Sequence, residues 1–281
     1  MNAIVLCADD FGLSDGVSRA IVELADAARI SATSAMVTTE AWPRSAEVIA
    51  GLRSRVAVGL HVNMTLGVPL TEMVRLAPDS RFPPLRTVVQ QALRRQLIVA
   101  ELTAEIRAQI QEFRERSGCM PDFLDGHQHV HALPQVRQAV VAAAGAFDWP
   151  GPLFVRSPSD SIANIVARRS EVAKSLTISA LSAGFRSYVR AAGLVTNSTF
   201  AGVSSFSRQT AFRDELIAAM RRPGRCHLIM CHPGYADDAL RRLDPVVERR
   251  EDEFETLLRD DTLPERIWRP SGSTRILMPH G

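Results

Sequence analysis

Two adjacent aspartates, Asp9 and Asp10, end the first apolar segment of the chain, in the stretch CADDFG at residues 7–12. Ordinary strand ends carry glycine, asparagine or proline, because turns favour these residues. A single aspartate in this place would most simply cap the helix after it. A pair allows one carboxylate to bind a cation while its neighbour performs a second task, so the meaning of the pair depends on the residues that end the other apolar segments.

Five of the seven histidines lie at the ends of apolar segments in the same way. His61 ends RVAVGLHV, the run DGHQHVH occupies residues 125–131, and His232 comes directly after HLIMC. Arg156 likewise comes after PLFV. Neutral imidazole and carboxylate are common ligands of divalent metal ions, and two histidines with one carboxylate form a recurrent hydrolytic or oxygenase site. The sequence therefore predicts a metal site that combines histidines with one of the two aspartates.

The histidine run by itself leaves its metal ligand open. Alternate residues would share a face in an extended segment, whereas His127 and His131 would align in a helix. His127 fits either arrangement, so we select it as the ligand. Each residue also has a structural explanation when taken alone. A histidine such as His61 often does no more than form a hydrogen bond within the core, and His232, which precedes Pro-Gly, could simply close a turn. These explanations do not account for the accumulation of such residues after several strands.

The apolar segments alternate with helical patterns, which predicts βαβ units and a parallel sheet. Six or seven strand and helix cycles without a break in composition favour one (β/α) barrel, complete or incomplete and distorted. A doubly wound open sheet is the alternative, but no G-x-G-x-x-G occurs after the first strand. In a barrel, catalytic residues lie at the carboxyl ends of the strands, where the residues above are found.

The domain organisation predicted from this pattern is a single barrel domain over residues 1–270, with a tail at 271–281. Four prolines between residues 66 and 84 indicate an irregular excursion, and residues 86–117 are expected to be helical. We expect residues 66–118 to form a helical insertion rather than a separate domain.

The formal net charge is +2, with 33 basic and 31 acidic residues, so no net field attracts nucleic acid. The four cysteines lack zinc-ribbon spacing, which indicates free thiols in a reducing compartment. The sequence contains no signal-peptide pattern and no run of 18 apolar residues. We expect a cytoplasmic protein; peripheral contact at the inner membrane surface and a homodimer are compatible with the sequence.

Five ordered motifs resemble those of the YdjC-like carbohydrate deacetylases, the ChbG/HpnK family. They are ADDFGLSDGV, GLHVNMTLGVPL, DGHQHVHALP, VRSP and MCHPGYADD, and the resemblance spans roughly residues 3–260. It implies a barrel of the glycoside hydrolase/deacetylase type, a divalent metal ion and removal of acetyl from an N-acetylated amino sugar. Zinc and magnesium are the expected ions.

The resemblance also implies a role for individual residues. Asp10, His61 and His127 would hold the metal ion, Asp9 would be the catalytic base, and His232 would be the general acid. Four further residues are expected to support the ligands or to contact substrate, unless their role is purely structural. They are Asp125, His129, His131 and Arg156.

The stretches NSTFAGVSSF and MCHPGYADDALRRLDPV look closer to the hopanoid-associated HpnK branch than to the chitooligosaccharide branch. The expected substrate is therefore an N-acetylated sugar or glycolipid, with an N-acetylglucosaminyl hopanoid as the specific candidate. Three alternatives remain open: a chitooligosaccharide deacetylase, a metal-independent glycosidase that uses the paired carboxylates, and a non-catalytic sugar- or metal-binding protein.

Overall fold

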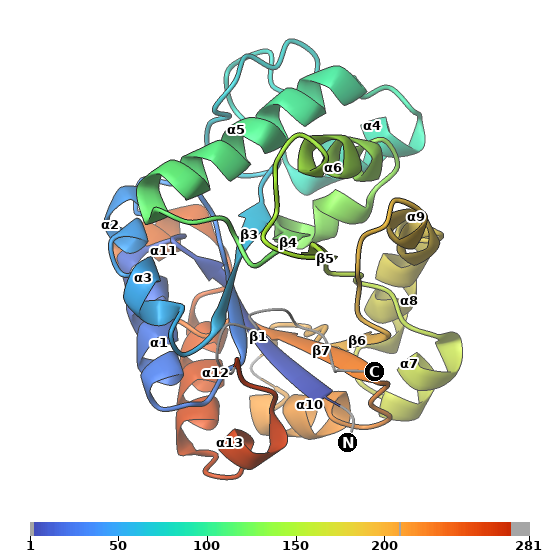
Figure 1. Ribbon diagram of the computed structural model, residues 1–281. Helices are drawn as coiled ribbons and strands as arrows, with labels where there is room; N and C mark the ends of the chain where they lie inside the picture. Colours follow the sequence, from blue (N-terminus) through green and yellow to red (C-terminus); the bar gives the residue numbers. More distant parts are fainter. Residues whose placement is uncertain (1–2, 208, 271–281) are drawn as a thin grey trace.

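Seven parallel strands form one curled sheet in the order β5-β4-β3-β2-β1-β7-β6 (Figure 1). The computed structural model describes residues 3–207 and 209–270, so the predicted tail lies outside the described residues. The strands are β1 (Ala3–Phe11), β2 (Ala32–Ala35), β3 (Ala57–Val62), β4 (Phe123–Gly126), β5 (Phe154–Val155), β6 (Thr199–Ala201) and β7 (Cys226–Cys231).

This strand order is that of a barrel opened at one seam. Adjacent strands of the sheet are consecutive in the chain, except that β1 pairs with β7. The consecutive strands β5 and β6 lie at the two opposite edges of the sheet. Across that seam, Phe154 forms an isolated parallel bridge with Val195, shortly before β6. The incomplete (β/α) barrel predicted from the sequence is confirmed, and the doubly wound sheet is not observed in the described residues.

Helices cover the outside of the sheet (Figure 1). The first half of the chain contributes α1 (Asp15–Asp26), α2 (Trp42–Ala46), α3 (Ile49–Leu52), α4 (Leu85–Leu93), α5 (Val99–Ser117), the 3₁₀ helix η1 (His127–Ala132) and α6 (Val136–Ala144). The second half contributes α7 (Ile162–Arg168), α8 (Val172–Leu181), α9 (Phe185–Ala191), α10 (Phe212–Ala219), α11 (Asp238–Leu243), α12 (Glu248–Arg259) and α13 (Leu263–Arg266). Among the described helices, none combines the length and the hydropathy of a membrane-spanning segment.

The strands are apolar on both faces because each face meets a different layer. In β1, Val5 and Cys7 pack inside the barrel against residues such as Leu228, whereas Leu6 and Ala8 join the layer between sheet and helices. All of these side chains are buried. Strands buried on both faces appear in a sequence as continuous apolar segments, which is why the strand ends were recognisable.

The insertion after β3 differs from its prediction in one respect. Residues 86–117 are helical except for a break between two helices: α4 ends at Leu93, and α5 begins at Val99 after a turn in which Arg95 adopts a positive φ of 55°. The buried Glu105 of α5 then accepts hydrogen bonds from the backbone amides of Leu70 and Thr71. These bonds join the loop at the start of the insertion to α5, and Gln109 of α5 exchanges two hydrogen bonds with the backbone of Asn63, directly after β3.

Candidate functional site

A bulge at the end of β1 aims both aspartates at the same place. Successive side chains of a regular strand point to opposite faces, but the register of β1 against β2 shifts between Ala8 and Phe11. Asp10 lies in this shift with a φ of 71°, a left-handed conformation that costs energy for a residue other than glycine. Strain of this kind is typical of functional sites, and here it turns Asp10 toward the pocket that Asp9 also lines.

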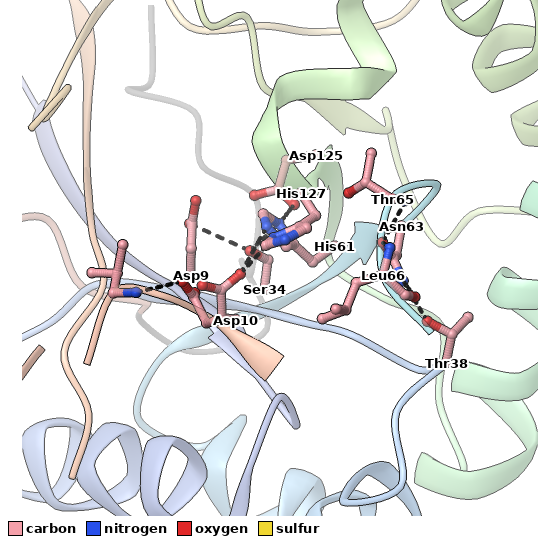
Figure 2. A network of polar contacts seen from close by, with 12 residues as sticks. Asp9, Asp10, Ser34, Thr38, His61, Asn63, Thr65, Leu66, Asp125 and His127 are labelled. Carbon is pink, nitrogen blue, oxygen red and sulfur yellow. Dashed lines mark hydrogen bonds and ion pairs between the residues drawn. The ribbon is translucent and has the colours of Figure 1, made fainter. Parts of the chain in front are cut away.

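Three side chains from three strand ends converge on one point. Oδ1 of Asp10 lies 3.3 Å from Nε2 of His61 and 3.0 Å from Nδ1 of His127. All three side chains are buried, and their donor atoms lie within 4.8 Å of one another. Figure 2 shows the two imidazole rings turned toward the Asp10 carboxylate. This set of one carboxylate oxygen and two imidazole nitrogens could hold a divalent ion.

Two groups beside Nδ1 fix the orientation of the His61 ring. Its Nδ1 lies 2.6 Å from Oδ1 of Asp125 and 3.0 Å from Oγ of Ser34, so this nitrogen donates a hydrogen bond and Nε2 faces Asp10. Burial lowers the pKa of His61, but the carboxylates of Asp125, Asp10 and Asp9 outweigh it and raise this pKa to about 10. In the metal-free protein His61 is therefore protonated at neutral pH.

Asp9 is paired with a fully buried arginine. Nη1 and Nη2 of Arg156 donate to the two carboxylate oxygens of Asp9 at 2.7 and 2.8 Å, and Nη2 forms an ion pair with Asp125 at 3.2 Å. Burial raises the pKa of Asp9, but Arg156 and His61 hold this pKa well below its usual value. Asp9 is therefore ionised throughout the neutral range.

The charges around the three donor atoms fit a divalent ion. Four carboxylates and two guanidinium groups are linked by ion pairs, which leaves a net charge of −2 when the histidines are neutral. A divalent ion would neutralise this charge, and burial makes such neutralisation important. The six groups are Asp9, Asp10, Asp125, Asp244, Arg156 and Arg250.

The histidine run is neither extended nor a regular helix. Gln128 and His129 both have left-handed backbone conformations, with φ of 52° and 62°, so the three histidine rings point in different directions. His127 faces Asp10. His129 packs edge-on against Phe200, whereas Nε2 of His131 donates to the carbonyl oxygen of Arg156 at 2.7 Å. His131 thus supports the loop that presents Arg156.

His232 lines the same pocket from the end of β7. Its ring lies edge-on to Phe206, and its Nδ1 has no hydrogen-bond partner among the described residues. Its backbone amide donates to the buried carboxyl group of Glu253. Burial lowers the pKa of His232 to about 4, although Asp10 and Asp9 oppose this shift. His232 is therefore neutral at pH 7.

Three residues around the donor atoms were not predicted from the sequence: Ser34, Asp244 and Arg250. Arg250 of α12 is 1% exposed, and its Nη2 donates to Oδ2 of Asp10 at 2.7 Å. It lies within the strongly charged stretch ERREDE, whose pattern is typical of a solvent-exposed helix face. No local pattern marks Arg250 as buried, because its burial depends on tertiary packing.

The converging residues line a cavity of about 290 Å³, near the lower end of the range for small-molecule sites. Its polar lining includes Asp9, Asp10, His61, His127 and His232. Its apolar lining consists of Leu85, Ile178, Phe206, Met230, Pro245 and Val246. A second cavity of about 240 Å³ lies between α4, η1 and α8. The residues that line both cavities are Leu85, Gln128, His129, Lys174 and Ile178, so the second cavity continues the first as an apolar groove.

Comparisons with known proteins identify relatives of this chain. The family model described as "YdjC-like protein" matches residues 3–265. The chitooligosaccharide deacetylase of Klebsiella pneumoniae is 30% identical over 238 residues, which cover 84% of this chain and 83% of that protein. The chitooligosaccharide deacetylase of Escherichia fergusonii is 35% identical over 141 residues, and that match spans about half of each protein, 50% of this chain and 55% of the relative.

A solved structure shares the fold over nearly the whole chain. The crystal structure of a proposed cellobiose-phosphate cleavage protein from Enterococcus faecalis V583 superimposes with a TM-score of 0.70. The two chains are 21% identical, and the superposition covers 96% of this chain and 97% of the other. At this level of identity the likeness establishes the barrel architecture alone.

Proposed function

Because the chain belongs to the YdjC-like family, we propose that it is a metal-dependent carbohydrate N-deacetylase that hydrolyses the acetamide of an N-acetylated amino sugar to acetate and a free amine. The observation that carries the proposal is the convergence of Asp10, His61 and His127 in one pocket with the ionised Asp9 and the neutral His232. These are the groups that metal-assisted hydrolysis of an unreactive amide uses: a metal site, a base and a carrier for the proton of the leaving amine.

Asp10, His61 and His127 would hold the divalent ion. When bound, such an ion polarises a carbonyl oxygen and lowers the pKa of water. Asp9 accepts the proton of the attacking water, because the paired Arg156 keeps its carboxylate ionised and fixed in orientation. Asp125 holds His61 in the tautomer that presents Nε2 to the metal site.

His232 is suited to carry a proton to the leaving nitrogen. An amine leaves only after its nitrogen is protonated, and the proton removed from water must reach it. With a pKa of about 4, His232 begins the reaction neutral, so its unpartnered Nδ1 can take over the proton that Asp9 removed from water and then donate it to the leaving nitrogen. We therefore propose that His232 first accepts a proton and then acts as the general acid.

A metal-independent glycosidase fits the site less well. Such an enzyme needs one carboxylic acid that stays protonated, with the second carboxylate on the other side of the sugar bond. Asp9 and Asp10 are adjacent, and each is paired with its own buried arginine. Arg156 and Arg250 hold the pKa of both carboxyl groups below its usual value, against the effect of burial, so neither is available as the acid.

The first test is acetate release. Incubation with a panel of N-acetylated oligosaccharides and glycolipids should give acetate and a product that has lost one acetyl group, measured by mass spectrometry. Cleavage of the sugar bond instead would favour the glycosidase. Binding of an N-acetylated sugar without release of acetate would favour a non-catalytic binding protein.

We further propose that the acceptor is a glycolipid, with an N-acetylglucosaminyl hopanoid as the specific candidate. The apolar groove supports this choice because Val89, Leu133 and Leu181 line it directly beside the catalytic pocket. The helix α8 has no buried residue, although it carries Val172, Leu176, Ile178 and Leu181. An apolar aglycone in this groove would leave the sugar at the metal site and place the enzyme at a membrane surface.

The apolar residues of the insertion could either line a lipid-facing groove or pack within the protein. Leu85 lines the groove, whereas Phe82 is buried in the core and Leu66 packs against it. Val68 and Leu70 are 49% and 42% exposed and line neither cavity. Internal packing therefore explains only part of this set.

Blocking the groove should separate the two classes of substrate. Thr177 is exposed and lines the groove but not the catalytic pocket, so Thr177→Trp should raise KM for a glycolipid about tenfold by excluding its apolar part. KM for a soluble N-acetylated sugar should stay unchanged. Ala163→Trp, at an exposed helical position that lines neither cavity, is the matched control. Equal KM values for the glycolipid in all three proteins would refute the groove assignment.

A further inference from the structure

Arg250 reaches the metal site from the far end of the chain. Its side chain is buried and held at three points. Nε donates to the carbonyl oxygen of Val246 at 3.0 Å, and Nη2 donates both to Oδ2 of Asp10 at 2.7 Å and to Oδ2 of Asp244 at 2.6 Å. This geometry leaves the guanidinium group little freedom to move away from Asp10.

The loop after His232 packs on the same arginine. The amide of Gly234 donates to the carbonyl oxygen of Arg250 at 3.1 Å. A Cβ atom at Gly234 would lie 3.4 Å from Cδ of Arg250 and 3.0 Å from Cγ2 of Val17. The side chain is therefore enclosed from the β7 side as well as anchored by Asp244.

The two oxygens of Asp10 consequently have different surroundings. Oδ1 faces His61 and His127, whereas Oδ2 is occupied by Arg250. A carboxylate that offers both oxygens favours large ions with many oxygen ligands, such as calcium. A carboxylate that offers one oxygen beside two imidazoles favours small ions with few ligands, such as zinc.

We propose that Arg250 restricts Asp10 to one metal-facing oxygen and thereby sets which divalent ions the site prefers. This inference rests on the metal dependence of the proposed function. Arg250 is a positioning residue, since it acts through Asp10. Removing its positive charge also strengthens the attraction for every divalent ion, so the informative quantity is the ratio of affinities for two ions.

The test compares zinc and calcium affinities by titration of the metal-free protein. In Arg250→Met the preference for zinc over calcium should fall about tenfold, the lower end of the usual effect of a residue that supports a metal ligand. Arg250→Lys, which keeps a charged donor, should retain a preference closer to that of the wild type. Arg249→Met is the matched control, because Arg249 is equally buried on the same helix and pairs with Glu215 and Asp252 instead.

A folded Arg250→Met variant with an unchanged zinc-to-calcium ratio would overturn the inference. If that variant does not fold, Asp244→Ala decides, since it removes one anchor of Arg250 and should shift the ratio in the same direction. An unchanged ratio in Asp244→Ala would then refute the positioning role. If the wild-type protein binds neither ion, the metal dependence of the proposed function fails instead.

Discussion

Asp9→Asn is expected to reduce turnover of an N-acetylated sugar by roughly 10²- to 10⁴-fold, the usual contribution of a general base. Asparagine has nearly the shape of aspartate but cannot accept the proton of the attacking water. Because Asp9 is not one of the three converging metal donors, the affinity for the divalent ion should remain within a few-fold of wild type. Initial rates of acetate release and titration with the ion measure the two quantities.

The structural cost of this substitution needs its own control, because Asp9 neutralises a buried arginine. Asp160→Asn is well matched, since Asp160 pairs with the buried Arg168 at 2.7 Å and does not line the catalytic pocket. Both variants should lower the midpoint of thermal unfolding, but only Asp9→Asn should lose turnover. Full turnover in Asp9→Asn would show that another group is the base.

The barrel and the converging donors were predictable for a common physical reason. Strands buried on both faces leave continuous apolar segments, and parallel strands bring their carboxyl ends to one edge. Asp10, His61 and His127 are separated by up to 117 residues along the chain, yet their positions at strand ends were enough to predict that they would meet. The bulge at Asp10 was not predictable, because aspartate, although enriched in the left-handed region, adopts it in only a minority of cases.

Other features depend on tertiary contacts that no local pattern encodes. The left-handed pair Gln128 and His129 sends the rings of the histidine run in separate directions, where the sequence offered only an extended or a helical arrangement. Arg250 is a similar case, since its burial results from the packing of α12 against α1 and α10. Sequence patterns assign arginine to the surface because buried arginine is rare unless it is paired.

Loss of the divalent ion is expected to abolish acetate release, and the affinity for that ion should depend on pH. In the metal-free protein the neighbouring carboxylates raise the pKa of His61 to about 10, so its Nε2 carries a proton at pH 7. A metal ion can bind only after this proton leaves. Affinity should therefore rise with pH below 10, by up to about tenfold per pH unit, with about one proton released per ion.

Calorimetric titration in two buffers with different ionisation enthalpies counts the released protons, and chelation with subsequent addition of zinc or magnesium tests the activity. His127→Ala should lower metal affinity by at least about 100-fold, because a direct ligand matters more than a supporting residue. His227→Ala controls for the loss of a buried histidine, since His227 bonds to Thr199 and Ala219 away from the pocket. Acetate release that survives complete removal of metal would mean that the three converging side chains serve the fold rather than the reaction.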